Sequence, residues 1–95
     1  LPKDTFDVAT MIEVIEHLAS PFSELDEVFY SLKEGGHVMI ETSFTDWLTL
    51  QDDYINPDAG HNTIWSHAGL TEMMLSKGFI EGEHINRNVR IYQKP

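Results

Sequence analysis

The 95-residue chain is long enough for one domain with a modest core, and its 41% hydrophobic and 23% charged residues exclude a disordered segment. The formal net charge of -10 argues against binding to nucleic acid or to an anionic membrane surface. The absence of cysteine excludes disulfides, cysteine-ligated zinc and thiol catalysis, and it favours a reducing, cytoplasmic compartment. No apolar stretch approaches the roughly 20 residues that span a bilayer, so we expect no membrane segment.

The first half of the chain has the pattern of a βαβ unit. Residues 6–12, FDVATMI, form a short apolar run that predicts a strand buried on both faces, as in a parallel sheet. Ser20 and Pro21 supply the N-cap and the first position of an amphipathic helix, which we expect to end at the next pair of glycines. A second strand, HVMIETS, follows over residues 37–43. A right-handed crossover makes these two strands parallel.

The middle of the chain, residues 44–67, shows no helical or strand periodicity. A loop of this length in a small domain is usually either functional or disordered. Large aromatic residues argue against disorder, so we expect an ordered loop over a site, with an acceptor pocket as one role for Trp47, Tyr54 and Trp65.

The end of the chain predicts a helix followed by a hairpin. The helix begins at Ser66 or His67 and closes before Gly78. Two strands then flank a turn at Arg87-Asn88 and pair as an antiparallel hairpin. The predicted fold is α/β, with two parallel strands and their crossover helix, then a helix and a C-terminal antiparallel hairpin. We expect the core to contain Phe22, Val28, Phe29, Leu32, Leu70, Met73, Met74 and Leu75.

Two long segments, FDVATMIEVIEHLASPFSELDEVFYSLKEGGHVMIETS and HNTIWSHAGLTEMMLSKGF, carry a resemblance that spans almost the whole chain. In order and content they resemble the second half of class I S-adenosylmethionine-dependent methyltransferases, with Glu34 where that family usually has proline. The resemblance implies a partial Rossmann-like sheet and S-adenosylmethionine as cofactor. It also implies methyl transfer to an oxygen or nitrogen acceptor, for which the acidic charge favours a small molecule over RNA.

The resemblance also implies that part of the cofactor site is absent. The family's glycine-rich turn after its first strand and the acidic end of its second have no counterpart in residues 1–95. We therefore expect these residues to be the C-terminal portion of one methyltransferase domain, active only in the full-length protein. The alternative is a non-catalytic interaction module built on the same half-fold. Residues 1–95 handled alone would expose the edge of the strand over residues 6–12, where the missing strands should pair, which predicts self-association or poor solubility.

The stretch EVIEHL, which follows the first strand, concentrates ionisable groups. If the chain becomes helical at Glu13, then Glu13, Glu16 and His17 share one face and could hold a borderline divalent metal. The resemblance offers a fourth ligand, because metal-dependent small-RNA 2'-O-methyltransferases combine a Glu-x-x-Glu-His segment with a His four residues before a Trp, as His61 stands before Trp65. The structural alternative leaves the carboxylates to favour the helix N-terminus through its dipole.

Other site residues follow from the same resemblance. Met11 and Ile12 would lie beside the methionine part of the cofactor, mostly through backbone groups. His17 or His61 could act as a general base that lowers the pKa of the acceptor, although both histidines could equally bond nearby backbone. Residues 41–43 end the second strand at the carboxyl edge, where ligands of open α/β sheets bind.

Overall fold

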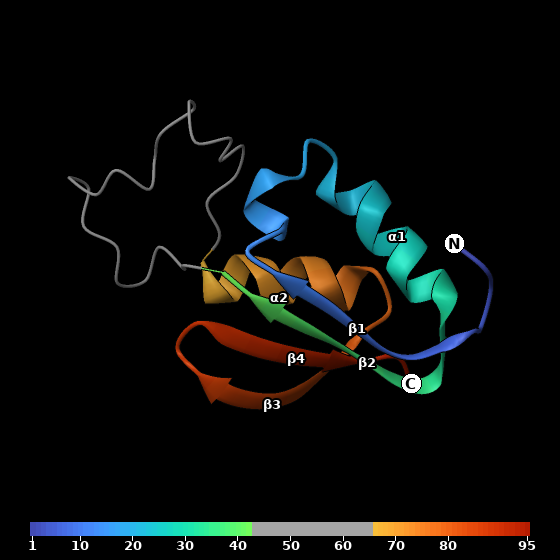
Figure 1. Cartoon of the computed structure of the whole chain (residues 1–95). Helices are drawn as coiled ribbons and strands as arrows, with labels where there is room; N and C mark the ends of the chain where they lie inside the picture. The colour runs from blue at the N-terminus through green and yellow to red at the C-terminus, as the bar shows by residue number, and fades with distance from the viewer. Residues whose placement is uncertain (43–65) are drawn as a thin grey trace.

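The computed structural model describes residues 1–42 and 66–95. In this part of the chain, four strands form one sheet in the order β1-β2-β4-β3, accompanied by two α-helices and a short 3-10 helix (Figure 1). The elements in chain order are β1 (Phe6–Ile12), η1 (Ile15–His17), α1 (Pro21–Ser31), β2 (Leu32–Glu41), α2 (His67–Ser76), β3 (Ile80–Asn86) and β4 (Val89–Gln93). No helix of these residues is long and apolar enough to cross a bilayer.

The predicted fold class is confirmed, because β1 pairs with β2 in parallel and the other pairings are antiparallel. The turn of the hairpin is stabilised by the Asn86 side chain, which accepts a hydrogen bond from the amide of Asn88 at 2.8 Å. Helix α2 starts as predicted, with the Ser66 side chain accepting from the amide of Gly69 at 2.9 Å.

Helix α1 ends earlier than its sequence predicts. It stops at Ser31, and Leu32 is already extended and pairs with Phe6 of β1. The two expected terminating glycines lie instead inside β2, where the pairing shifts register before Val8 meets His37. A Cβ at Gly36 would lie 2.9 Å from one carbonyl oxygen and 3.1 Å from another, so this bulge requires glycine.

Both helices pack on the same face of the sheet. Met11 and Ile40 are register partners on that face, and they join one buried cluster with Leu25 of α1 and Leu70 of α2. Phe29 of α1 also packs edge-on against Phe79, which lies between α2 and β3, with the two ring centres 5.0 Å apart. The other members of the cluster are Ile15, Leu32, Val38, Met73, Met74, Phe79 and Tyr92.

Three burial expectations were wrong. Strand β1 is not buried on both faces, since Phe6, Val8 and Ile12 are 41%, 60% and 51% exposed. In the described residues both helices pack on the other face, which leaves these side chains uncovered. Phe22 and Leu75 were expected in the core but are 55% and 50% exposed, because they lie on the outer sides of their helices.

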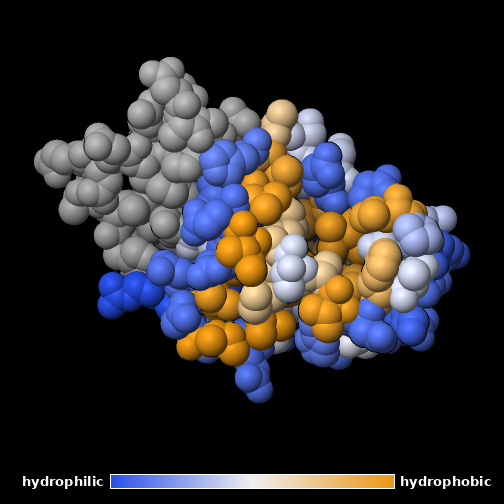
Figure 2. Space-filling view, viewed as in Figure 1, coloured by the Kyte–Doolittle hydropathy of each residue, from blue (hydrophilic) through white to orange (hydrophobic). Residues whose placement is uncertain are grey.

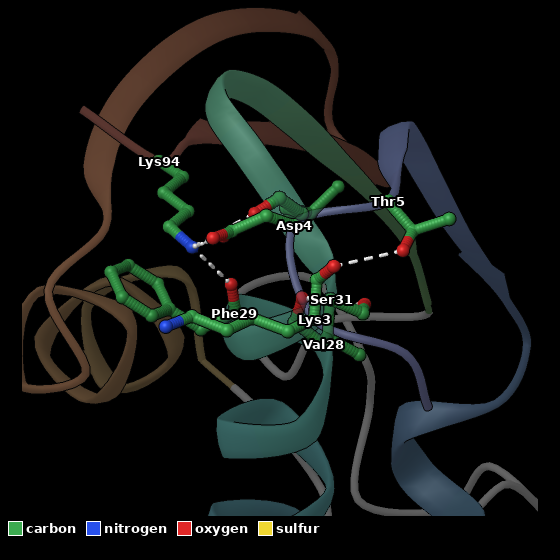
Figure 3. A network of polar contacts seen from close by, with 8 residues as sticks. Lys3, Asp4, Thr5, Val28, Phe29, Ser31 and Lys94 are labelled. Carbon is green, nitrogen blue, oxygen red and sulfur yellow. Dashed lines mark hydrogen bonds and ion pairs between the residues drawn. The ribbon is translucent and has the colours of Figure 1, made fainter.

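Lys94, just beyond β4, explains where α1 ends. Its ammonium donates to the carbonyl oxygens of Phe29 and Leu32 at 2.9 and 2.8 Å, which are backbone acceptors at the end of the helix (Figure 3). It also pairs with the Asp4 carboxylate at 3.2 Å and lies 4.7 Å from the centre of the Phe29 ring. One side chain thus joins both ends of the chain to α1.

Replacing Lys94 by Met should lower the free energy of unfolding by about 2–3 kcal/mol, because charge-assisted hydrogen bonds to two carbonyls are lost. The matched control is Lys33→Met, which removes an exposed ion pair to Asp7 at 3.6 Å and should cost less than about 0.5 kcal/mol. Urea unfolding followed by circular dichroism measures both. Equal losses in the two variants would contradict the capping role.

Candidate functional site

The carboxyl ends of β1 and β2 lie side by side, because the two strands are parallel and in register to their last residues. The amide of Glu13 extends this pairing by donating to the carbonyl of Glu41 at 2.8 Å. The amide of Thr42 donates in turn to the carbonyl of Asn88 at 3.1 Å, which joins the hairpin turn to the same edge. Ligands of open α/β sheets bind at such an edge.

The turn after β1 is not the predicted helix. Glu13 has a left-handed backbone, with φ of 54°, and the helical segment is only the 3-10 turn over Ile15–His17. This conformation is costly for a residue with a side chain, about 1–2 kcal/mol, so the surroundings must impose it. The fully buried Ile15 shows what the bend achieves, since it places that side chain in the hydrophobic core.

Glu16 is the interior residue of the turn. It is fully buried, and its carboxylate accepts a hydrogen bond from the hydroxyl of Thr42, which is fully buried as well. A buried carboxylate is tolerable only where donors replace the water it has lost. The bond connects the turn after β1 to the end of β2, so it fixes the shape of the carboxyl edge.

The other two ionisable groups of the turn lie on the outside. Glu13 and His17 are exposed, whereas Glu16 points into the core, so the three side chains do not share one face. Within residues 1–42 and 66–95, no three His, Asp or Glu side chains are grouped so as to hold a metal ion. His61 lies outside the described residues, so the four-ligand set with His61 stays a prediction.

The two residues predicted to adjoin the cofactor point to opposite faces of the sheet. Met11 is buried among the helices, whereas Ile12 is half exposed on the other face at the carboxyl edge. Their cofactor contacts stay a prediction. The other candidates of the sequence analysis, Ser43, Trp47, Tyr54, His61 and Trp65, lie outside the described residues.

Sequence reasoning placed Thr42 at this edge but missed its partner. The usable signal was a hydroxyl directly after the second parallel strand, opposite a carboxylate in the turn after the first. A second, partly buried polar pair lies at β4, where the Tyr92 hydroxyl is 2.7 Å from that of Thr71 in α2. Burial raises the pKa of Tyr92, so its phenol stays neutral at physiological pH and serves as a structural group.

Thr42→Val should lower the free energy of unfolding by about 2–4 kcal/mol, because the buried Glu16 carboxylate loses a donor while the volume at residue 42 is kept. Thr42→Ser keeps the hydroxyl and loses one methyl group, so its cost should be about 1 kcal/mol. Equilibrium urea unfolding compares the two. A valine variant as stable as the serine variant would mean that the hydrogen bond does not hold the turn.

Comparison with known proteins identifies a family that the chain matches. The profile of a family described as "Methyltransferase domain" matches residues 2–80. No curated protein sequence matches the chain significantly. A S-adenosylmethionine-dependent methyltransferase structure from Thermotoga maritima superposes with a TM-score of 0.79 at 19% identity, over 99% of this chain and 57% of that one.

Two further solved structures have the same fold. A S-adenosylmethionine-dependent methyltransferase from Methanosarcina mazei gives a TM-score of 0.64 at 20% identity, over 97% of this chain and 60% of that one. The cyclase SpnF superposes with a TM-score of 0.69 at 20% identity, over 87% of this chain and 29% of that one. The chain thus spans less than two thirds of each structure, and at these identities the likeness concerns the fold alone.

Proposed function

Because the chain belongs to the methyltransferase-domain family, we propose that the protein containing it moves the methyl group of S-adenosylmethionine to an oxygen or nitrogen atom of a small molecule. The observation that carries the proposal is the family match over residues 2–80. The acidic net charge of -10 supports a small acceptor over RNA. Since the chain spans 57% of the Thermotoga structure, the proposed activity is that of the whole protein.

The described residues fit one side of a cofactor site. Ile12 offers an exposed apolar surface at the end of β1, and the exposed Glu13 carboxylate next to it favours a positively charged ligand. Met11 supports this position from within the core. When bound, S-adenosylmethionine supplies a methyl group already activated by a positively charged sulfur. The protein then has to orient the acceptor and take its proton.

His17 suits the proton transfer. Its imidazole is exposed at the carboxyl edge, on a turn that the buried neighbours Ile15 and Glu16 hold in place. A general base must reach the acceptor from a fixed position, and a neutral imidazole can take a proton near neutral pH. We assign the same role to His61 as the alternative base, from the sequence resemblance alone.

The position of Glu16 bears on the proposed divalent metal. A metal set built on Glu13, Glu16, His17 and His61 would need these side chains to converge on one ion, yet Glu16 is fully buried and bonded to Thr42, whereas Glu13 and His17 are exposed. The geometry therefore supports the alternative in which Glu16 is structural.

A non-catalytic interaction module is the second candidate. The likeness to the cyclase SpnF, an enzyme named for a different reaction, means that the fold by itself does not decide between methyl transfer and another role. The two candidates differ in whether the full-length protein binds S-adenosylmethionine.

The first test is a calorimetric titration of the full-length protein with S-adenosylmethionine. The second incubates the protein with S-adenosylmethionine and a panel of small hydroxyl and amine acceptors, and mass spectrometry then detects the cofactor that has lost its methyl group. We expect binding and turnover. His17→Gln should lower turnover by about 10²–10⁴-fold while binding is kept, as for loss of a general base.

The matched control is His37→Gln, at an exposed histidine in the middle of β2, which should leave turnover unchanged. Full activity in the His17 variant would remove this residue from the mechanism and favour His61. Failure of the wild-type protein to bind S-adenosylmethionine would refute the enzyme and support the interaction module.

A further inference from the structure

Arginine and histidine side chains gather where the hairpin turn meets the start of α2. Arg87 lies in the turn between β3 and β4, and Arg90 follows it in β4. His84 of β3 is the register partner of Arg90. His67, the first residue of α2, bonds through its Nε2 to the carbonyl oxygen of Arg87 at 2.8 Å. Figure 1 shows the start of α2 and the β3–β4 turn at the same end of the molecule. These four residues are called the basic cluster below.

The sequence around the basic cluster contains no acidic residue. The chain has 16 Asp and Glu, yet none of them lies in residues 66–71 or 84–95. Helix α2 therefore starts without the acidic side chain that often complements the positive end of a helix dipole. In Figure 2 the surface is strongly hydrophilic at the end where the β3–β4 turn lies in Figure 1. A protein with a net charge of -10 thus has a local region of positive potential here.

Arg90 differs from the lysines of the chain in its partner. Lys33, Lys77 and Lys94 pair with aspartates at 3.6, 3.0 and 3.2 Å. Arg90 instead contacts an imidazole, with its Nη1 2.7 Å from Nε2 and 2.8 Å from Nδ1 of His84. A guanidinium can only donate, so the imidazole accepts this bond in its neutral form. The Nε of Arg90 is buried and has no hydrogen-bond partner in the described part of the chain.

A buried cation with an unfilled donor calls for an anion. Leaving such a donor unfilled costs free energy, and a bound ion or ligand is one physical explanation for it. The planar fork of a guanidinium matches a carboxylate or a phosphate. Glu81 is a weak competitor, because its half-exposed carboxylate lies 3.8 Å from Nε2 of His84, beyond hydrogen-bond range. The donors of Arg90 therefore remain available to a ligand.

The basic cluster lies beside the edge where the acceptor would bind. The amide of Thr42, at the end of β2, donates to the carbonyl oxygen of Asn88, the neighbour of Arg87. The turn that carries His17 follows β1, which is two strands from β4 in the sheet. Adjacent strands are about 5 Å apart, so the two positions are separated by roughly 10 Å across the sheet. One small molecule can span this separation.

Building on the proposed methyl transfer, we infer that the acceptor carries an oxyanion, a carboxylate or a phosphate, which Arg90 and Arg87 bind while its reacting atom lies near His17. The methyl group moves from sulfur to the hydroxyl or amine, whose proton passes to the imidazole, and the oxyanion stays unchanged. The net charge of -10 does not prevent this, because salt screens distant charges beyond about 8 Å and leaves the nearby arginines to act. The two arginines are thus specificity-determining residues.

The first test measures acceptor preference with the full-length protein. It compares acceptors in pairs that share the reacting group: a carboxylate with its amide, and a phosphate monoester with the alcohol from which it derives. We expect the anionic member of one pair to have a kcat/KM about 10–100-fold higher, and the pair that shows this identifies the oxyanion. Equal values within both pairs would overturn the inference.

Variants assign the preference to the basic cluster. Arg90→Gln should raise KM for the anionic acceptor by about 10–100-fold and leave kcat unchanged, because the arginine binds a group remote from the reacting atoms. Arg87→Gln should act in the same direction and keeps the backbone carbonyl that bonds His67. The matched control is Lys33→Gln, at an exposed cation paired with Asp7, which should change nothing. Equal losses for the charged and neutral acceptors in both arginine variants would contradict the assignment.

The second test needs no turnover. Inorganic phosphate and, separately, acetate are titrated into the full-length protein, and NMR follows the arginine Nε–H signals. The signal of Arg90, identified by its loss in Arg90→Gln, should be visible because its Nε is shielded from solvent. At least one of the two anions should shift it to saturation, whereas chloride at equal ionic strength should not.

The two tests separate this inference from the proposed function. An Arg90 signal that phosphate, acetate and chloride all leave in place, or all move equally, would overturn the anion site even if methyl transfer occurs. Failure to bind S-adenosylmethionine would refute the proposed function, and the phosphate and acetate titrations would still decide whether the basic cluster binds an oxyanion.

Discussion

The hydrogen bond between the buried side chains of Glu16 and Thr42 is the constraint on which the carboxyl edge of this sheet depends. Parallel pairing brings the ends of β1 and β2 together, but it does not by itself determine the path of the chain beyond them. The hydrogen bond between Glu16 and Thr42 determines that path, because it ties the turn after β1 to the end of β2 inside the core. An uncompensated carboxylate there would cost several kcal/mol, so the turn has little freedom to take another shape.

This constraint divides the turn into an inner and an outer part. Ile15 and Glu16 are buried and anchor it, while Glu13 and His17 remain at the surface. Functional groups are most effective when a rigid frame positions them and water or ligand can still reach them. A stretch of three ionisable groups thus separates into one structural carboxylate and two surface groups at the edge where a ligand would bind.

The sequence predicted the elements of the fold well because their signals are local. Periodicity, the N-cap at Ser66 and the turn residues identified the βαβ unit, the second helix and the hairpin. The end of α1 could not be predicted in this way, since the ammonium that donates to the carbonyl of Leu32, the residue after the helix, belongs to Lys94, 62 residues further along the chain. The exposure of β1 also escaped prediction, because it depends on what covers the sheet.

The candidate site was predicted in location but not in geometry. The resemblance identified EVIEHL as the turn at the carboxyl edge, and the structure confirms its place after β1. Helical spacing was expected to place Glu13, Glu16 and His17 on one face. This does not occur, because Glu13 adopts a left-handed backbone in place of a helical one. Single-residue conformations of this kind are imposed by packing around them, here by Ile15, and side-chain identity alone does not reveal them.

Hydrogen exchange at the amide of Glu13, followed by NMR, tests the claim of a fixed turn most directly. This amide bonds to the carbonyl of Glu41 at the point where the strand becomes the turn. If the turn is held as described, the amide should exchange only on global unfolding, with the same free energy of opening as the buried amides of Val38 and Ile40 in β2. Exchange as fast as in a surface loop would show that the turn opens on its own and would contradict the account.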